Sequence, residues 1–465
     1  MRRNYRTFEA RPSRAPLLIL VVVIAVSFLG WAVVRNQGPV IRLVRPVKTI
    51  GVATPVEFSV TDSAHAIKRA QLGIEQNGRK FILIFTAVKT ALPKRAAWKF
   101  WQGSGSEWQV HAVAGKRTAP ALADGAATLR LVAVNNSWGR FFRGGRSVFA
   151  VKLPVRVTPP RIDVLTQQDY INQGGSGLVV FKVSPADAKS GVQVGNLFFP
   201  SWPVNPSQTE TRLCLFAFPY NADLSTPVRI VARDDAGNDA VAEFAHEIVP
   251  QVFRKRTLFL SRSFLERAVP AILRHMPKLK NEGSLLKNFL EINNQLRAKE
   301  ARQLAALSHD TRPRFLWSGA FLALANSQVE ARFADRRTYV YNGQVIGHHS
   351  HLGFDLASVE HAPVLAANSG VVVMTRYFGI YGNAIVIDHG CGLESLYAHL
   401  ESFAVKVGER VVRGQLIGHT DTTGLAEGDH LHFAVLVDGV PVNPLEWWDP
   451  RWIKSHIEAQ LALAR

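Results

Sequence analysis

The sequence is poor in cysteine, with Cys214 and Cys391 alone among its 465 residues. They lie far apart in segments of different character, which excludes a disulfide framework and predicts two buried thiols. No Cys-x-x-Cys pair and no His-Glu-x-x-His stretch occurs, so the usual structural and helix-borne zinc motifs are absent. Acidic residues are scarce relative to basic ones, with 36 Asp and Glu against 55 Lys and Arg, a net charge of +19.

The basic excess predicts attraction to a polyanion, whether nucleic acid, anionic lipid or an anionic cell-wall polymer, without deciding among them. Apolar residues make up 47% of the chain and charged residues 20%. These are proportions of folded protein and argue against wholesale disorder. The length exceeds that of one compact domain and predicts about three. We therefore expect a multidomain protein.

An uncharged run from Pro16 to Val34 follows the basic N-terminus. It is long enough to cross a bilayer as a helix, and no small-x-small cleavage site follows it. We therefore predict a basic cytoplasmic tail over 1–15 and a retained transmembrane anchor over 16–34. The positive-inside rule favours this orientation only weakly, because basic residues stand on both sides of the run: Arg2, Arg3, Arg6, Arg11 and Arg14 before it, and Arg35, Arg42, Arg45 and Lys48 after it.

Short runs of alternating apolar and polar residues fill positions 40–250 and predict half-buried strands. Thr158-Pro159-Pro160 marks a boundary, because a double proline resists both helix and central strand. Asp235-Ala-Gly-Asn238 has the composition of a hairpin turn. We predict a mainly β protein with two tandem immunoglobulin-like β-sandwiches, at 35–157 and 158–250.

A basic helical segment is expected over 251–330. Apolar residues recur at helical spacing in two stretches, of which the second, 284–308, begins with Ser284 as its predicted N-cap. Pro270 lies inside the first and predicts a short or kinked helix. Residues 252–314 hold 14 Lys and Arg against 5 Asp and Glu, a net +9. This charge fits a solvated helical face between domains, or a basic arm along an acidic polymer or membrane surface.

Short strands return after this segment. We predict an antiparallel β domain over 331–445 and a C-terminal helix over 446–465. Nine of the fifteen histidines lie between His348 and His432, within this domain. This concentration of histidines is the sequence feature that gives the most information about function.

Two patterns have the spacing of metal ligands, His351-x-x-x-Asp355 and His430-x-His432. Side chains alternate between faces in a strand, so His430 and His432 point the same way, as do 351, 353 and 355. Gly353 then leaves room where a metal would sit. A hydrolytic zinc site needs three protein ligands and an open position for water, so these patterns indicate a zinc hydrolase.

As an ordered set, the motifs of residues 345–444 closely resemble those of the lysostaphin/LytM-type zinc endopeptidases. That family has a compact antiparallel β fold with zinc in a groove, and its members cut peptide bonds of bacterial peptidoglycan. The resemblance covers about a fifth of the chain. The motifs are His351-x-Gly-x-Asp355, Tyr381-Gly-Asn-Ala-Ile-Val-Ile-Asp-His-Gly390, Tyr397-Ala-His-Leu400, Val407-Gly408, Gly414-Gln-Leu-Ile-Gly418 and His430-Leu-His-Phe433.

The resemblance implies a role for each of five residues. His351, Asp355 and His432 would bind one Zn²⁺ per chain. His430 would be the general base, and His399 would orient it or stabilise the developing oxyanion. We expect the remaining histidines of this region to be loop or surface residues, with the first two as conceivable extra ligands: His348, His349, His361, His389 and His419.

The chain departs from the family pattern at two places near the site. Ala426-Glu-Gly-Asp429 stands where the family commonly has Ser-Thr-Gly-Pro, and Ala434 follows Phe433 where a glutamate is usual. These positions shape the loop and the surroundings of the ligands. They put substrate preference and rate in doubt more than activity itself.

Together these features predict a membrane-anchored zinc metalloendopeptidase that hydrolyses peptidoglycan cross-links or stem peptides. Such a substrate places the catalytic domain in the periplasm or outside the cell and the N-terminus in the cytoplasm. The basic charge suits an anionic wall or membrane surface, and partners in the wall machinery stay unidentified. The alternative is a non-catalytic LytM-like regulator that activates another wall hydrolase. Nucleic-acid binding has only the net charge in its favour.

Overall fold

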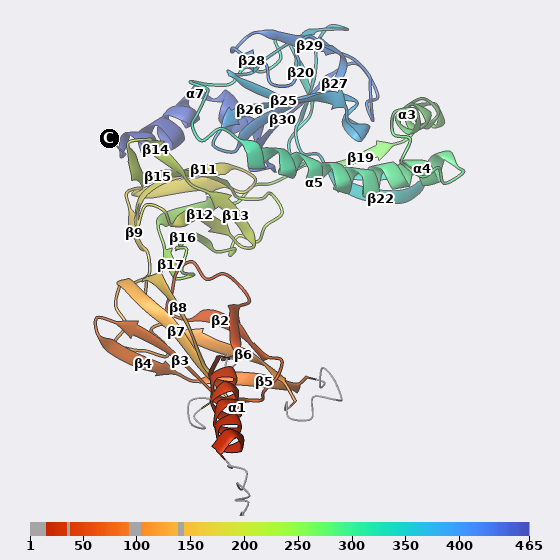
Figure 1. Cartoon of the computed structure of the whole chain (residues 1–465). Helices are drawn as coiled ribbons and strands as arrows, with labels where there is room; N and C mark the ends of the chain where they lie inside the picture. Colours follow the sequence, from red (N-terminus) through yellow and green to blue (C-terminus); the bar gives the residue numbers. More distant parts are fainter. Residues whose placement is uncertain (1–14, 35–37, 93–103, 138–143, 465) are drawn as a thin grey trace, which may run out of the picture. The chain divides into compact units, whose positions relative to one another are not determined.

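The structure is a computed structural model that describes residues 15–34, 38–92, 104–137 and 144–464 (Figure 1). These residues belong to two compact units. One contains Met1–Pro159 with Asp235–Asn238, and the other contains Pro160–Asp234 with Asp239–Arg465. The predicted basic tail and the flanking Arg35 fall outside the described residues.

Helix α1 spans Ala15–Val34 and carries no acidic residue in its first turn and no basic residue in its last. The helix predicted over 16–34 is therefore present. Within the described ranges, no helix combines the length and the hydropathy that crossing a bilayer would take. The membrane-spanning role predicted for this helix is accordingly not shown.

Two four-stranded antiparallel sheets follow α1 in the first unit, in the orders β1-β2-β6-β5 and β4-β3-β7-β8. Alternate residues of each sheet face one shared core, such as Phe58 on one sheet and Leu131 on the other. The alternating sequence pattern thus does produce half-buried strands. The strands are β1 (Val40–Leu43), β2 (Thr54–Asp62), β3 (Ile67–Gln76), β4 (Arg79–Leu83), β5 (Phe85–Ala91), β6 (Ser106–Ala114), β7 (Gly125–Asn135) and β8 (Arg146–Val155).

A second pair of antiparallel sheets begins the second unit, in the orders β14-β15-β11-β9 and β13-β12-β16-β17, beside a parallel pair β10-β18. Arg233 pairs with Asp239 across the turn at 235–238, which confirms the predicted hairpin. The strands are β9 (Arg161–Val164), β10 (Gln168–Asn172), β11 (Ser176–Ser184), β12 (Lys189–Val194), β13 (Leu197–Pro200), β14 (Trp202–Asn205), β15 (Gln208–Ala217), β16 (Val228–Arg233), β17 (Asp239–Ala242) and β18 (Ala245–Val249).

The basic segment predicted over 251–330 contains helices between 262 and 310, but residues 255–259 form a strand and 311–327 contain no helix. The side chain of Ser284 caps the second helix, as predicted, by accepting a hydrogen bond from the Lys287 backbone N–H. The first helix runs on past Pro270, so it is not cut short, because Leu265, Val269 and Ile272 anchor it on both sides of the proline. A π-helical turn interrupts the second stretch. The elements are β19 (Lys255–Phe259), α3 (Arg262–His275), α4 (Leu285–Glu291), η1 (Ile292–Leu296), α5 (Arg297–Leu307) and η2 (Ser308–Asp310).

A ten-stranded antiparallel sheet forms the centre of the histidine-rich region, with the main path β20-β23-β30-β27-β26-β25-β28. A smaller sheet has the order β19-β21-β22. The strands are β20 (Gln328–Ala331), β21 (Arg336–Tyr341), β22 (Gln344–Ser350), β23 (Phe354–Ala357), β24 (Pro363–Leu365), β25 (Gly370–Tyr377), β26 (Asn383–Gly390), β27 (Leu393–Phe403), β28 (Arg410–Val411), β29 (Leu416–Thr420), β30 (Leu431–Val437) and β31 (Val440–Val442), and a 3-10 turn, η3 (Gly379–Tyr381), precedes β26.

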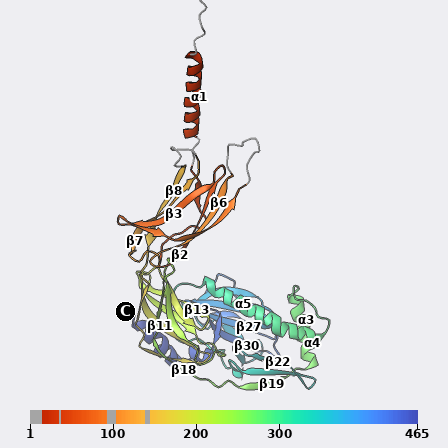
Figure 2. The ribbon, with the colours of Figure 1, turned by 90° about the horizontal axis from the view of Figure 1, so that it is seen from below.

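Both faces of the large sheet are covered, which explains why β30 is buried along its whole length. Leu304 of α5 packs on one face with Leu396 and Ala434, and Figure 2 shows α5 running alongside β27 and β30. The predicted C-terminal helix is present as a continuous helical run over 450–462, made of α7 (Pro450–Trp452), the π-helical η4 (Ile453–Glu458) and α8 (Ala459–Ala462). Asp449 separates this run from the short helix α6 (Pro444–Trp448).

The other face of this sheet shares one apolar core with the second β-sandwich. Phe181 and Phe216 of the sandwich belong to the same buried cluster as Tyr397 and Phe433 of the large sheet. A polar link runs beside this core, because the carboxylate of Glu446 accepts hydrogen bonds from Ser176 and Asn172. The large sheet and the sandwich therefore pack as one body within the second unit.

Candidate metal centre

The side chains of three residues converge on one point. Two of these residues lie on neighbouring strands, and the third lies in the loop before one of the strands. Asp355 on β23 and His432 on β30 are direct register partners, and His351 lies just before β23. His351 Nε2 is 2.9 Å from Asp355 Oδ1 and 3.0 Å from His432 Nδ1, and His432 Nδ1 is 2.9 Å from Asp355 Oδ1. All three residues are buried and form a group able to hold a metal ion.

The donor set fits zinc. Zinc sites use imidazole nitrogens and carboxylate oxygens about 2.0–2.2 Å from the metal, and a catalytic site has three protein ligands with a fourth position open. The three donor atoms of His351, Asp355 and His432 are about 3 Å from one another, so a zinc ion between them could have three protein ligands. Gly353 is also needed here, because a Cβ at this position would stand 2.7 Å from the His432 ring.

The surroundings fix the orientation of these donors. His351 donates from Nδ1 to the carbonyl oxygen of Arg332, which leaves the lone pair of Nε2 facing the site. Asp355 turns Oδ1 toward the histidines, while its Oδ2 accepts a 2.8 Å hydrogen bond from Arg337. Burial alone would raise the pKa of Asp355, but the neighbouring histidines His351, His430 and His432 outweigh it and hold that pKa well below its usual range.

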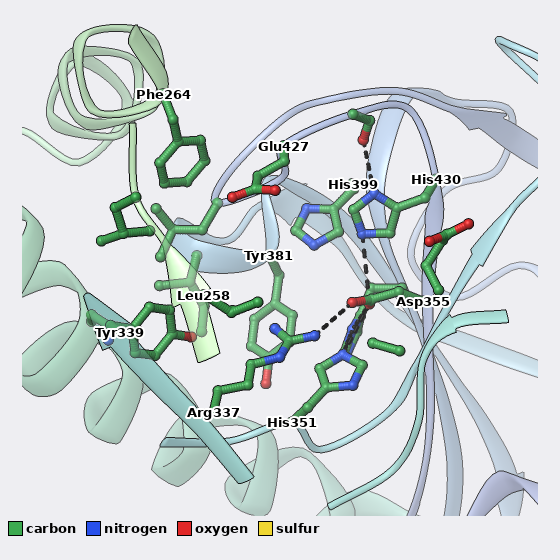
Figure 3. A pocket seen from close by; sticks show the side chains of 18 of the residues that line it. Leu258, Phe264, Arg337, Tyr339, His351, Asp355, Tyr381, His399, Glu427 and His430 are labelled. Atoms are coloured by element: carbon green, nitrogen blue, oxygen red, sulfur yellow. Dashed lines mark hydrogen bonds and ion pairs between the residues drawn. The ribbon is translucent and has the colours of Figure 1, made fainter. Parts of the chain in front are cut away.

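Two further histidines stand beside the converging donors (Figure 3). His430 Nε2 lies 3.5 Å from Asp355 Oδ1, and the rings of His399 and His430 are 4.8 Å apart between centroids. Each donates from Nδ1 to a main-chain carbonyl oxygen, of Gly428 for His430 and of Thr423 for His399. Each ring therefore presents its Nε2 to the site, with that of His430 facing Asp355.

The two rings differ in basicity. Burial, followed by the nearby histidines, holds the pKa of His399 well below its ordinary value, so His399 is neutral near pH 7. Burial also lowers the pKa of His430, but its hydrogen bond to Asp355 outweighs this and leaves the pKa raised. His399 has a left-handed φ of +60°, a strained conformation for a residue other than glycine, and such strain is frequent at functional sites.

A cavity of about 410 Å³ opens on this site, and its other walls come from the helical segment and from β19 and β21. Phe264 and Phe289 of the segment line it beside His399 and His430. Arg267 of α3 donates hydrogen bonds of 2.8 and 2.9 Å to the carbonyl oxygens of Ala426 and Glu427. The segment thus holds the loop that replaces the family's Ser-Thr-Gly-Pro stretch.

The remaining histidines of the region stay outside the group of donors, and one of them corrects the sequence analysis. His389 is fully buried rather than exposed, with ring nitrogens bonded to the Ser369 carbonyl oxygen and the Ser395 hydroxyl. Sequence reasoning also missed Arg337, which lies outside every motif. In the sequence, the only indication of its position is that Arg337 and Tyr339 are two residues apart and so point to the same face of a strand.

The antiparallel sheet and its buried His-Asp-His group are those of a metallopeptidase. The model of peptidase family M23 matches residues 349–444. These residues form an M23 domain of the lysostaphin/LytM type, which confirms the resemblance seen in the motifs.

Known proteins are similar to this chain in the same region. Over 119 residues it is 39% identical to the peptidoglycan DD-endopeptidase ShyA of Vibrio cholerae, covering 26% of this chain and 27% of ShyA. Over 95 residues it is 42% identical to the DD-carboxypeptidase/endopeptidase Mpg of Neisseria meningitidis, covering 20% and 22%. The catalytic domain of lysostaphin from Staphylococcus simulans is 28% identical, covers 28% of this chain and 96% of that domain, and has a TM-score of 0.23. The chain spans about a quarter of the length of these curated relatives.

Proposed function

We propose that this protein is a zinc metalloendopeptidase that hydrolyses peptide bonds in the cross-links or stem peptides of bacterial peptidoglycan. The observation that carries the proposal is the convergence of His351, Asp355 and His432 beside His399 and His430 in one cavity. The relatives named above as peptidoglycan DD-endopeptidase and DD-carboxypeptidase/endopeptidase support the substrate class.

His351 Nε2, Asp355 Oδ1 and His432 Nδ1 would hold the zinc ion. When bound, zinc lowers the pKa of a water ligand and polarises the carbonyl group of the scissile bond. His430 accepts the proton of the attacking water at Nε2, because its Nδ1–H is already donated to Gly428. His399, neutral and with only an acceptor facing the site, orients that water or His430 rather than donating to an oxyanion.

The decisive experiment compares the muropeptides released from purified peptidoglycan by the wild type and by His430→Ala at equal zinc content. We expect the wild type to release peptide fragments and the variant to release almost none. Equal release by both proteins would overturn the assignment of the base. If the zinc-loaded wild type released nothing, while a separate wall hydrolase became active in its presence, the protein would be a LytM-like regulator.

We also propose that the chain works outside the cytoplasm, at the cell membrane. The peptidoglycan substrate supports this location, and the uncharged stretch 16–34 with its basic flanks supports an anchor there. The paired antiparallel sheets of 35–157 and 158–250 would be immunoglobulin-like spacers between membrane and wall. Membrane fractionation of the full chain, compared with a chain that starts at residue 35, tests the anchor: equal amounts in the soluble fraction would refute it.

A further inference from the structure

Two arginines stand next to each other in the wall of the cavity. Arg256 of β19 and Arg337 of β21 are register partners in a parallel strand pair, so their side chains leave the same face of the sheet. Both line the cavity together with the three converging donors. Like charges on paired positions repel each other, so this end of the cavity favours an anion between them.

The protein does not use all the hydrogen-bond donors of either guanidinium group. Arg337 donates from one terminal nitrogen to Asp355 and is also hydrogen-bonded to the Tyr339 side chain. Its buried Nε has no hydrogen-bond partner in the part of the chain that the structure describes. Arg256 donates to the main-chain carbonyl oxygen of Glu330, and within the described ranges its guanidinium group forms no ion pair. A guanidinium group has five N–H donors, so several remain for a ligand.

The cavity has four acidic lining residues: Glu330 beside Arg256, the ligand Asp355 beside Arg337, and Glu427 and Asp429 on the loop before His430. Glu427 belongs to the loop before His430, and Figure 3 shows it on the other side of the drawn pocket from Arg337. Asp429 accepts a hydrogen bond from the backbone of His361. The loop end of the cavity is therefore acidic. At the strand end, the guanidinium groups of Arg256 and Arg337 stand beside Glu330 and the ligand Asp355.

The strand end is also close to the position of the reacting bond. Arg337 is 2.8 Å from Oδ2 of Asp355, whose Oδ1 is 2.9 Å from the two donor histidines. A group bound by the arginines therefore lies within about one residue of the bond that is cut, because consecutive Cα atoms are about 3.8 Å apart.

We propose that Arg256 and Arg337 form a subsite for a free carboxylate on the residue that follows the scissile bond. Guanidinium groups bind carboxylates through paired charge-assisted hydrogen bonds. Two kinds of substrate carry such a group: the terminal residue of an uncross-linked stem peptide, and a cross-bridging diamino acid whose second carboxylate is free. This inference rests on the proposed peptidase function and assigns its substrate class.

The test uses the full chain, loaded with zinc, and four synthetic peptides. A linear stem peptide and a cross-linked dimer are each prepared with this carboxylate free or as the carboxamide. We expect the wild type to cleave the free acid of at least one pair with a kcat/KM about 10- to 100-fold above that of its amide, as hydrogen bonds to charged groups warrant. Whichever pair shows the preference identifies the source of the carboxylate.

Arg256→Gln is the informative variant, because among the described residues Arg256 hydrogen-bonds to the Glu330 carbonyl oxygen and forms no hydrogen bond or ion pair with the three donors. It should raise KM for the free acid and reduce the preference to about threefold or less, while cleavage of the amide stays unchanged. Arg336→Gln is the matched control, because Arg336 is an exposed neighbour that does not line this cavity. It should keep the wild-type preference.

A binding measurement tests the carboxylate subsite separately from the proposed peptidase function. NMR titration of the chelator-treated protein with D-alanyl-D-alanine and with its carboxamide should show tighter binding of the free acid, lost in Arg256→Gln. Equal cleavage of acid and amide by the wild type would overturn the subsite and leave the peptidase function standing. Absence of cleavage with a retained binding preference would overturn the function alone, and absence of both would overturn the two together.

Discussion

A methyl group at Gly353 should disable the metal centre without removing any ligand. In Gly353→Ala, the new Cβ would stand 2.6 Å from the carbonyl oxygen of Phe433 and 2.7 Å from Cε1 and Nε2 of His432. The φ of Gly353 lies outside the left-handed region, so the alanine backbone itself is tolerated. The substitution therefore adds steric crowding at the His432 ring and at the Phe433 carbonyl oxygen, without backbone strain at position 353.

The size of the effect follows from these distances. The His432 ring would have to retreat by about 0.7 Å to restore ordinary van der Waals contact at 3.4 Å. Metal–ligand distances tolerate deviations of only about 0.2 Å, and overpacking of a buried site costs about 1–3 kcal/mol. We expect the free energy of unfolding of the metal-free protein to fall by that amount. Zinc affinity should fall about 10- to 100-fold, as for other disturbances of ligand orientation.

Zinc affinity would be measured by competition with a chromophoric chelator, and stability by urea unfolding in the presence of EDTA. Gly347→Ala is the control, because a Cβ at Gly347 meets no atom within 4 Å. This control should match the wild type in both assays. Zinc affinity of Gly353→Ala within twofold of the wild type would show that the His432 ring is not confined as the structure indicates.

Three further changes probe the same region. His430→Ala should lower kcat about 10²- to 10⁴-fold at unchanged zinc content, since general-base catalysis contributes that much; a smaller loss would remove His430 from the base role. Asp355→Ala should abolish zinc retention on dialysis, measured by metal analysis, because it removes one donor and leaves Arg337 buried without its carboxylate; full zinc occupancy would contradict the ligand set. Burial raises the pKa of Glu300 from 4.5 to about 8, so the stability that its proton contributes is complete below pH 4.5 and is lost as the pH rises to about 8. Glu300→Gln should therefore flatten the fall in urea-unfolding free energy across this range, by up to about 1.4 kcal/mol per pH unit, and identical slopes would refute the prediction.

Residues that lie close in sequence, or on paired strands, were predictable. Alternation along a strand places His430 and His432 on one side, and both approach Asp355 in the structure. Gly353 was expected to leave room at the metal, and the structure shows the contact that makes this necessary. Periodicity and motif order were sufficient here because the sheet register follows from them.

Residues brought to the site by tertiary packing were not predictable. Arg337 belongs to no motif, and its position depends on how β21 lies beside β23. Glu300 is at a helical position with charged neighbours, yet it is buried and bonded to the backbone N–H of Ile380. His389 was expected at the surface, because a single sequence does not reveal that Ser369 and Ser395 satisfy both ring nitrogens inside the core.

The shared core of the large sheet and the second β-sandwich limits where this chain can be divided to make truncated or chimeric proteins. A chain reduced to residues 349–444 would lose Phe181 and Phe216 from that core and would end before Glu446. It would also lack the strand that carries Arg256 and the helix that holds the loop before His430. Residues 349–444 are therefore not an independent unit for domain exchange. Chimeras with other proteins that contain an M23 domain should join the chains near Pro160, where the second unit begins.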